Sequence, residues 1–337
     1  MITSYFNPAH YRTRRNNYET FAAPLRAAGI PLRTVECAFG DDPFDLPSGP
    51  EVLQVRGRDV LWQKERLINL GVSQLPPLAN KVAWLDGDIL FTNPDWAVQT
   101  AALLDHFPVA QPFSERGNLL LDGTSHDEQT GSLKSFAFLH GIDPALIHIG
   151  NYSEHGNTGF AWAAQRNVLA RHGLYDAFIS GAGDHLMAHA MCGDFSGLCM
   201  RTYFDDPLID RFSRESPLRR LLRKRLPASL KRRVRELSGI RNTNSELRTH
   251  FEAWGRSFYQ TVRGQVGYTP GTILHLWHGD EADRGYGKMR RELKKLDFNP
   301  TTDLRLGASG CWEWAGNKPA LHRLAKKFFS ARHEDGV

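Results

Sequence analysis

The chain has 337 residues, of which 41% are hydrophobic and 23% charged, proportions that are ordinary for a globular enzyme with a large core. No apolar run approaches the ~20 residues of a transmembrane helix, and the first residues lack the layout of a signal peptide, so we expect a cytoplasmic protein. The four cysteines form no Cys-X-X-Cys pair and are predicted to be reduced packing residues: Cys37, Cys192, Cys199 and Cys311.

The net charge of +5 is concentrated in one segment. Between Arg211 and Glu236 there are eleven Arg or Lys against two Glu, and leucines recur at helical spacing on both sides of Pro227. We expect two short cationic amphipathic helices there. Residues 211–235 are therefore a candidate surface for an anionic membrane, at its inner face, or for a nucleic acid. In the alternative interpretation the leucines pack on the enzyme body and the charges stay solvated.

The first third of the chain alternates between strand and helix patterns. A strand at 2–6, a loop and an amphipathic helix open the chain in the order that is typical of a nucleotide-binding half. A second strand at 32–36 ends in Glu36, which should then face the ligand crevice at the carboxyl ends of the strands. A short strand at 52–55 and an amphipathic helix over 60–69 follow. That helix can project Lys64, Arg66 and Asn69 toward a diphosphate, or its charges can simply be solvated.

The central motif is Leu85-Asp-Gly-Asp88, in which a buried strand over 82–85 ends in two carboxylates one residue apart. We expect Gly87 to let the backbone turn tightly, so that Asp86 and Asp88 point at one hard divalent cation, which can in turn hold phosphates. A bare Asp-Gly-Asp triplet is also compatible with a solvated turn at the end of a strand.

The later elements are predicted from the same patterns. Asp184 should lie at a helix N-terminus behind two glycines, where it can be a catalytic acid or only an N-cap. Residues 114–132 should form a mobile loop over a site. The remaining expectations are helices at 97–104, 166–173, 186–191, 245–262 and 320–329, and strands at 108–112, 157–163 and 271–278.

These elements predict an α/β fold in three parts. Residues 1–205 should form the nucleotide-binding and catalytic core, and residues 206–244 a basic amphipathic insertion. Residues 245–337 should complete the metal or acceptor site and end in a helical tail.

The order of the motifs over residues 1–300 resembles the GT-A fold of nucleotide-sugar glycosyltransferases, including family 2 and chondroitin GalNAc-transferase-like members. Leu85-Asp-Gly-Asp88 looks like the Asp-X-Asp motif of that family, and Arg66 with Asn69 resembles the Arg-Asn pair upstream of it. Asn157-Thr-Gly-Phe-Ala-Trp162 is similar to the strand that contacts the donor sugar. The resemblance implies a mixed central sheet flanked by helices.

Two further motifs belong to the same resemblance. Gly181-Ala-Gly-Asp184 resembles the turn that carries the acceptor-activating acid of inverting members, although the usual pair of acids is here Gly183 and Asp184. Leu274-His-Leu-Trp-His278 looks like a run whose histidine binds metal in the family, and both His275 and His278 are candidates for that ligand.

The resemblance implies transfer of a sugar from a nucleoside-diphosphate sugar, with UDP favoured, to a hydroxyl acceptor. A cation held by Asp86 or Asp88 together with a histidine would neutralise the leaving diphosphate, and nitrogen beside carboxylates favours Mn²⁺, with Mg²⁺ as the alternative. Asp184 is the expected base, and one base without a nucleophilic partner indicates inversion. Glu36 would meet the base or ribose of the donor, and Trp162 the face of its sugar.

Two functions of other classes remain open from the sequence. A metal-dependent hydrolase could use Asp184, His185 and His189, because the two histidines share one helical face, although both are as readily packing residues. A non-catalytic polyanion-binding module would explain residues 211–235 and leave the Asp-Gly-Asp motif without a role. The donor sugar and the acceptor, whether a glycan, a lipid-linked glycan, a protein or a modified DNA base, are not specified by these patterns.

Overall fold

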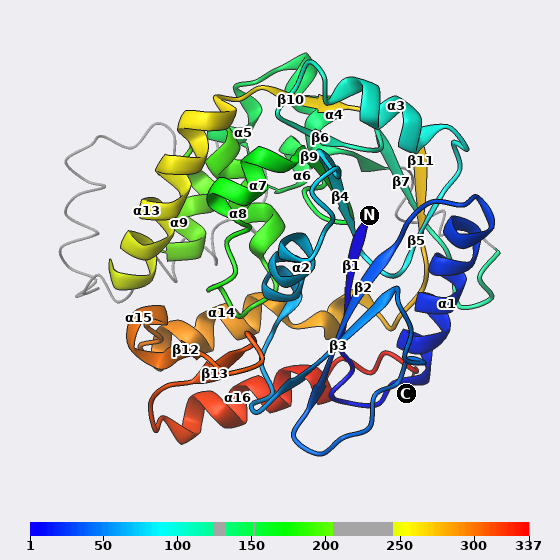
Figure 1. Cartoon of the computed structure of the whole chain (residues 1–337). Coiled ribbons are helices and arrows are strands. Elements are labelled where there is room, and N and C mark those ends of the chain that lie inside the picture. Colours follow the sequence, from blue (N-terminus) through cyan, green and yellow to red (C-terminus); the bar gives the residue numbers. More distant parts are fainter. Residues whose placement is uncertain (125–132, 151, 205–244, 337) are drawn as a thin grey trace, which may run out of the picture.

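The structure, a computed structural model, describes residues 1–124, 133–150, 152–204 and 245–336 (Figure 1). Its centre is a seven-stranded sheet in the order β10-β6-β9-β4-β1-β2-β3. Its strands are parallel to their neighbours except β9, which runs antiparallel to both β4 and β6. The strands are β1 (Ile2–Tyr5), β2 (Arg33–Phe39), β3 (Val52–Gly57), β4 (Lys81–Leu85), β6 (Val109–Gln111), β9 (Ala161–Gln165) and β10 (Val266–Tyr268). The expected mixed α/β architecture with a largely parallel central sheet is thus observed.

Helices cover both faces of this sheet. Because both faces are buried, the strands are nearly continuous runs of apolar residues. In β4, Val82 and Trp84 face one core cluster, while Ala83 and Leu85 face the other. The first cluster packs on α2 (Lys64–Ser73), α7 (Arg166–His172), α8 (Gly183–Met191) and α13 (Ser245–Val262). The second packs on α1 (Arg12–Ala27) and α3 (Trp96–Leu103).

A second, four-stranded sheet, ordered β5-β11-β7-β8, adjoins the carboxyl end of β4. Its strands are β5 (Ile89–Phe91), β11 (Thr272–His275), β7 (Glu115–Asn118) and β8 (Leu133–Lys134). Because β4 and β5 are separated only by residues 86–88, the Asp-Gly-Asp motif is the junction between the two sheets. Asp86 and Asp88 therefore lie where the strand direction changes, at the edge that holds ligands in open α/β sheets.

The remaining helices lie around these sheets (Figure 1). They are α4 (Phe136–Ile142), α5 (Leu146–Ile149), α6 (Tyr152–His155), α9 (Leu198–Phe204), the 3₁₀ turn η1 (Glu281–Arg284), α14 (Tyr286–Lys295), α15 (Pro300–Asp303) and α16 (Pro319–Ser330), and a small hairpin is formed by β12 (Leu304–Leu306) and β13 (Trp312–Trp314). No helix among the described residues is long and apolar enough to cross a membrane.

The C-terminal segment returns to the N-terminal helix, and Figure 1 shows the chain end beside α1. Phe329 of α16 stacks on Trp62 with ring centroids 6.3 Å apart. Arg14 of α1 forms a two-pronged ion pair with Glu334, with nitrogen to oxygen distances of 3.0 and 2.9 Å. The last residues therefore belong to the same body as β1 and α1.

Several element boundaries differ from the expectations for identifiable reasons. Helix α2 begins at Lys64 rather than near residue 60, because the side chain of Gln63 exchanges two hydrogen bonds with the backbone of Trp312. Strand β9 begins at Ala161, because Phe160 has a positive φ of 78° that interrupts the extended backbone. The expected loop at 114–132 contains strand β7, and its residues 125–132 lie outside the described residues.

Two strands connect the expected C-terminal part with the core. Residues 245–337 supply β10 to the seven-stranded sheet and β11 to the four-stranded sheet, so this part is built into the core. The basic segment at 211–235, with its proposed membrane or nucleic-acid surface, falls within 205–244 and lies outside the described residues. All four cysteines are free and buried, as predicted.

Candidate functional site

The candidate site lies at the junction of the two sheets, where residues 86–88 connect β4 to β5. The backbone here is held from two sides: the Asp86 N–H donates to the Phe160 carbonyl at 2.7 Å, and the Leu276 N–H donates to the Asp88 carbonyl at 2.8 Å. Gly87 is not required by the turn, since its φ is not positive and a Cβ would meet only ordinary contacts at 3.7 Å. The neighbours of the motif, rather than its glycine, fix the two aspartates.

Asp88 lies with both candidate histidines. One ligand atom each of Asp88, His275 and His278 lies within 4.8 Å of the other two. The carboxylate Oδ2 of Asp88 is 3.3 Å from Nε2 of His278 and 4.0 Å from Nε2 of His275, and the two Nε2 atoms are 3.1 Å apart. The other carboxylate oxygen of Asp88, Oδ1, is buried without a hydrogen-bond partner among the described residues. Carboxylate oxygen and imidazole nitrogen thus converge on one point.

Burial and neighbouring charges keep these two histidines neutral. The pKa of His275 lies well below its usual range because of burial and the adjacent His278, and that of His278 because of burial and nearby arginines. Nδ1 of His275 lies 3.3 Å from Oδ1 of Asn118, a partner that leaves Nε2 free to offer its lone pair. In the resting protein the two Nε2 atoms, 3.1 Å apart, can share one hydrogen bond in which His278 donates, and a cation would take the place of that proton.

Asp88 is the acid of this group. Burial, and next the charge of Asp86, raise its pKa to about 7, while Arg14 opposes the shift. Its side chain is still 26% exposed, so the carboxylate lies at the mouth of the cluster. A cation could reach it from solvent, and a bound cation would favour its ionised form.

On the other side of the junction Lys64 joins two carboxylates. Its Nζ lies 2.5 Å from Oδ1 of Asp86 and 2.6 Å from Oδ2 of Asp184. Burial opposes the charge of Lys64, but Asp184 and Asp86 outweigh it and raise its pKa well above the usual value. Asp184 lies in the first turn of α8, where the helix dipole favours an anion. Burial raises the pKa of Asp184, and Lys64 lowers it.

Glu65 of α2 lies beside Gly183, the position at which the resemblance leads one to expect a second acid. A Cβ on Gly183 would come within 2.2 Å of Oε1 of Glu65, so only glycine fits beside this carboxyl group. Glu65 is buried, accepts a hydrogen bond from Nε1 of Trp62 at 2.9 Å, and has its pKa raised by burial to about 8. The neighbouring acid of Asp184 therefore comes from α2, and it is protonated at neutral pH.

Trp162 is not at the site. It is 0% exposed, stands opposite Trp84 in the β4–β9 register, and donates from Nε1 to the Thr158 carbonyl at 2.7 Å. The expected contact with the donor sugar is wrong, because Trp162 faces the core between the sheet and the helices. The residue of this motif that reaches the site is Phe160, whose ring lies 5.0 Å from that of His275. Its strained φ of 78° is of a kind that concentrates at functional sites.

Arg66 and Asn69 also point elsewhere. The Nε of Arg66 donates to the Gly310 carbonyl at 2.7 Å, and both side chains contact Oδ2 of Asp176, at 3.2 and 3.0 Å. The expectation that this pair faces the diphosphate is corrected: the two residues tie α2 to the loops around residues 176 and 310. Lys64, at the first position of α2, is the cation of this helix that reaches the aspartates.

Glu36 lies at the expected edge of the sheet, but its carboxylate is occupied. Oε1 accepts from the N–H groups of Asp45 and Leu46 at 2.6 and 3.1 Å, and Oε2 accepts from Gln54 at 3.0 Å. Since Glu36 is 2% exposed, the expected contact with a base or ribose is corrected to a structural role in holding the 40–50 loop. A small hollow beside it is lined by Tyr5, Asn7, His10, Asp42 and Asp45.

Asp86 and Asp88 were expected to bind one cation together. Asp86 instead pairs with Lys64, and Asp88 alone groups with the histidines. The site consequently has two halves, one on each side of the Asp-Gly-Asp turn. One half offers oxygen and nitrogen atoms that can bind a cation, and the other holds two acids bridged by a lysine.

The rival arrangement of Asp184 with His185 and His189 is not formed among the described residues. The carboxylate of Asp184 contacts Lys64, whereas His189 pairs through Nδ1 with Asp194 at 2.7 Å. Both histidines are buried on the inner side of α8, at 5% and 0% exposure. A hydrolase that uses these three groups as one site is not supported.

Glu334, near the C-terminus, is a residue of the site that no motif had indicated. Oε1 of Glu334 lies 3.9 Å from Nδ1 of His278. Burial would raise the pKa of Glu334, but the charges of Arg14 and Arg332 outweigh it and lower this pKa to about 2. No local pattern marks Glu334, because its partners Arg14 and His278 come from distant parts of the chain.

No protein-family model matches the chain, and no curated protein matches it. Among solved structures, the chain is similar to the catalytic domain of Drosophila β1,4-galactosyltransferase 7 in complex with xylobiose. The identity is 13% and the TM-score 0.28, and the match covers 56% of this chain and 58% of that one, so the chain spans just over half of that structure's length. At this level the likeness leaves the function to be argued from the side chains of the site.

Proposed function

We propose that the protein is a metal-dependent, inverting glycosyltransferase of GT-A type that moves a sugar from a nucleoside-diphosphate sugar to a hydroxyl acceptor. The observation that carries the proposal is the junction itself: a carboxylate with two neutral imidazoles on one side, and a lysine between two aspartates on the other. Charge neutralisation for a diphosphate and a base for a hydroxyl are the two needs of this reaction.

The donor set fits a divalent cation. Asp88, His275 and His278 offer one oxygen and two nitrogens, and the unpartnered Oδ1 of Asp88 is an orphaned buried acceptor that such a cation would satisfy. This mixture suits Mn²⁺ better than Ca²⁺. When bound, a divalent cation would neutralise the charge that develops on the leaving diphosphate.

Asp184 is the proposed base. The acceptor oxygen attacks the anomeric carbon as the bond from that carbon to the diphosphate oxygen breaks, the bonding electrons leave with the diphosphate, and the acceptor proton passes to Asp184. Burial raises the pKa of this carboxylate toward the operating range of a base. Lys64, 2.6 Å away, keeps it ionised and oriented in the resting protein. Burial disfavours the ionised form of Glu65, and Asp86, the other acid beside Asp184, is held in an ion pair with Lys64, so neither is a free nucleophile.

Lys64 has a further part in the proposal. Its ammonium lies between Asp86 and Asp184 and is the cation of α2 nearest the motif, so an incoming diphosphate would compete with Asp86 for it. The sequence resemblance assigned this role to Arg66 and Asn69, which are engaged with Asp176.

Calorimetric titration with UDP, in the presence and absence of Mn²⁺, tests the central claim. We expect binding that requires the metal and that is lost in His278→Ala, with Arg305→Ala, an exposed arginine of the β12 hairpin, as a matched surface control. A screen of nucleotide sugars for manganese-dependent hydrolysis then identifies the donor. UDP binding that ignores both the metal and His278→Ala would contradict the proposal.

A further inference from the structure

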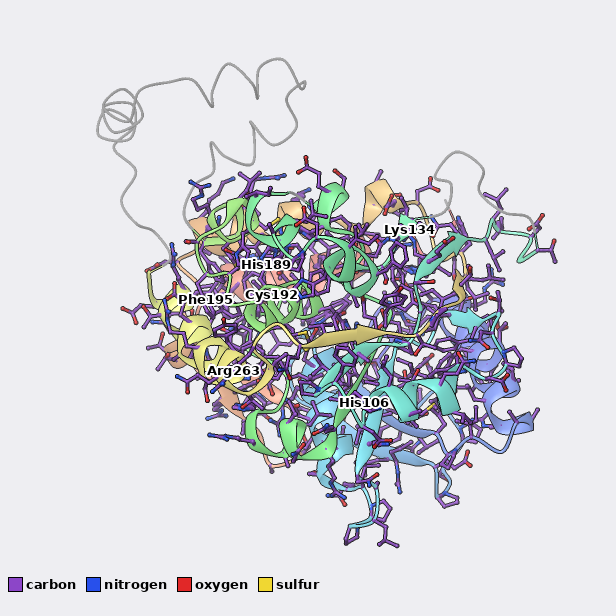
Figure 2. All side chains as sticks on the ribbon, turned by 90° about the horizontal axis from the view of Figure 1, so that it is seen from above. His106, Lys134, His189, Cys192, Phe195 and Arg263 are labelled. Carbon is purple, nitrogen blue, oxygen red and sulfur yellow. The ribbon has the colours of Figure 1, made fainter. Side chains whose placement is uncertain are left out.

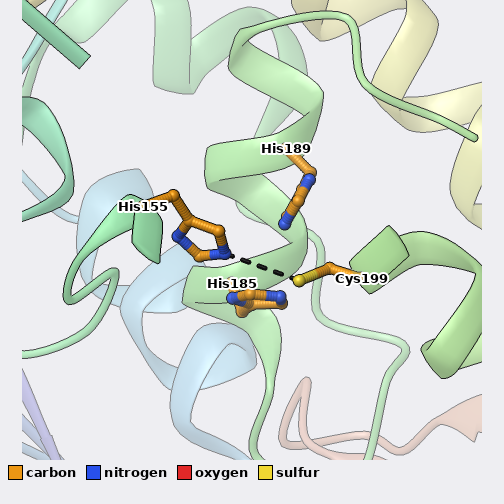
Figure 3. Close-up of side chains that lie close together, drawn as sticks. All are labelled: His155, His185, His189 and Cys199. Carbon is orange, nitrogen blue, oxygen red and sulfur yellow. Dashed lines mark hydrogen bonds between the residues drawn. The ribbon is translucent and has the colours of Figure 1, made fainter. Parts of the chain in front are cut away.

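A second cluster of potential metal ligands lies inside the helical half of the molecule, apart from the sheet junction. It consists of His155 at the end of α6, His185 and His189 one turn apart on α8, and Cys199 in α9 (Figure 3). Figure 3 shows the three imidazoles and the thiol around a common centre. All four side chains are buried, with exposed fractions of 1%, 5%, 0% and 6%.

The spacing of the four ligand atoms suits one tetrahedral ion. They all lie within 4.8 Å of one another, and Sγ of Cys199 is 3.5 Å from Nε2 of His155. In a tetrahedral zinc site with Zn–N of about 2.05 Å and Zn–S of about 2.3 Å, neighbouring ligand atoms are separated by about 3.4 to 3.6 Å. The Cys199–His155 pair already has this separation, and the other ligands need to move inward by no more than about 1 Å.

The imidazoles present free lone pairs to the centre. Nε2 of His185 and Nε2 of His189 are buried and have no hydrogen-bond partner among the described residues. Nδ1 of His189 pairs at 2.7 Å with Asp194, whose carboxylate accepts in turn from the Gly197 N–H at 2.8 Å. Nδ1 of His185 lies 3.5 Å from the hydroxyl of Thr158. A carboxylate behind a ligating histidine is the common outer support of a metal site, because it fixes the tautomer that leaves Nε2 free.

The packing around the cluster closes it. The ring of Tyr203 stacks on His185 with centroids 4.9 Å apart, and the ring of Tyr152 lies 5.7 Å from the same histidine. Phe136 covers His155 at 6.4 Å. Four protein ligands under such a cover leave no position for water or substrate, which distinguishes a structural metal site from a catalytic one.

We propose that His155, His185, His189 and Cys199 bind one structural zinc ion. A thiolate with three imidazoles selects Zn²⁺ over Mg²⁺, Ca²⁺ and Mn²⁺. The ion joins α6, α8 and α9, and its ligand His185 directly follows Asp184, so it also fixes the first turn of the helix that carries the proposed base. In this role the zinc positions Asp184 and takes no part in the transfer.

Zinc content measured by plasma mass spectrometry, on protein expressed with added zinc and passed over a chelating resin, tests the site. We expect about one zinc per chain in the wild type, and below about a tenth of that in Cys199→Ser and His189→Ala. Cys192→Ser is the matched control, because Cys192 is also a buried thiol near a histidine, 3.8 Å from Nδ1 of His140, but lies outside the cluster. Figure 2 marks His189 and Cys192 close together in the same helical region.

Two further measurements keep the result unambiguous. Asp88→Asn should retain its zinc, which separates this site from the sheet junction. The wild type loaded with Co²⁺ in place of zinc should show a thiolate-to-cobalt charge-transfer band, which decides the case even where Cys199→Ser fails to fold. A folded wild type that holds no zinc and takes up none on titration, or a Cys199→Ser protein that keeps its zinc, overturns the proposal.

Discussion

The Asp88, His275 and His278 cluster and the His155, His185, His189 and Cys199 cluster use the same side chain, a buried neutral imidazole, in two different settings. At the sheet junction the third ligand is a carboxylate that remains 26% exposed. In the helical half the remaining ligand is a buried thiol, and aromatic rings cover the group. The first cluster can accept further ligands from solvent, and the second is complete.

The two proposals differ accordingly, because the number and exposure of the ligands, more than the presence of histidine, distinguish the proposed catalytic metal site from the proposed structural one. Open coordination positions are what a diphosphate needs, and a closed sphere of four protein ligands contributes folding free energy instead. Burial lowers the histidine pKa values in both clusters, so a perturbed pKa alone does not distinguish them.

The two regions meet on helix α8. Its first turn carries Asp184, which faces Lys64 and the sheet junction, and the next residue, His185, faces the closed cluster. A substitution in one region should therefore leave the metal content of the other unchanged.

The largest effect is expected from Asp184→Asn. The amide keeps the shape but cannot take a proton, so transfer should fall by about 10²- to 10⁴-fold. Donor binding in Mn²⁺ should remain, because Asp184 is not among the ligands of either cluster. Single-turnover transfer and calorimetry with UDP measure the two properties separately. A loss of donor affinity as large as the loss of rate would assign Asp184 to the diphosphate site instead.

Asp88→Asn tests the open cluster. Removing its anionic ligand should weaken Mn²⁺ binding by at least about 10- to 100-fold and reduce transfer with it, while zinc in the closed cluster is unaffected. Brief treatment with a chelator should act on the wild type in the same sense: activity is lost and returns with Mn²⁺ alone. If the activity returns only with Zn²⁺, the two clusters are not independent.

The strands of the central sheet other than β10, the main helices and the junction could be predicted from the sequence because their signals are local. The apolar run before Asp86 and the heptad-like pattern of 245–262 give β4 and α13. The expected cation ligands His275 and His278 also lie together with Asp88, because strand β11 pairs with β5 next to the motif. The sequence motif and the pairing of β11 with β5 thus place the same histidines beside Asp88.

The directions of individual side chains could not be predicted in the same way. Lys64 and Arg66 lie two residues apart on α2 and point to different sides of the helix, and the packing of α2 against β1 and β2 sets which side meets the aspartates. Trp162 turns into the core and Phe160 lies beside His275, because the strand begins only after the positive φ of Phe160. The closed cluster joins three helices, and only the spacing of His185 and His189 was visible locally. Such outcomes depend on tertiary contacts that no window of sequence contains.

Glu65 lies between the two regions, against Gly183 of α8, and its protonation should affect the stability of both. Its pKa of about 8 in the folded protein exceeds its usual value, so between about pH 4.5 and pH 8 the folded state holds a proton that the unfolded state lacks. This contribution to stability is complete below about pH 4.5 and is lost as the pH rises through 8, at up to about 1.4 kcal/mol per pH unit.

Glu65→Gln should remove this dependence while keeping an acceptor for Nε1 of Trp62. Denaturant unfolding of both proteins between pH 5 and 9 measures this dependence. As the pH rises, the free energy of unfolding of the variant should increase relative to that of the wild type by a few kcal/mol. Exposed Glu246→Gln serves as the control. A constant difference across the range would show that Glu65 is ionised throughout.

The smallest effect is expected from Trp162→Phe, and it tests whether the core between the two regions serves either of them chemically. Trp162 packs on Phe136, which also contacts His155, yet Trp162 has no exposed surface for a sugar. The substitution should lower the free energy of unfolding by about 1–3 kcal/mol, through lost volume and the lost hydrogen bond to the Thr158 carbonyl, and leave the KM for the donor unchanged. Trp84→Phe is the matched control, because Trp84 is buried opposite it and its Nε1 has no partner among the described residues. The two variants should therefore differ by about 1 kcal/mol, the contribution of one hydrogen bond, whereas a raised KM in Trp162→Phe alone would return this tryptophan to the donor site.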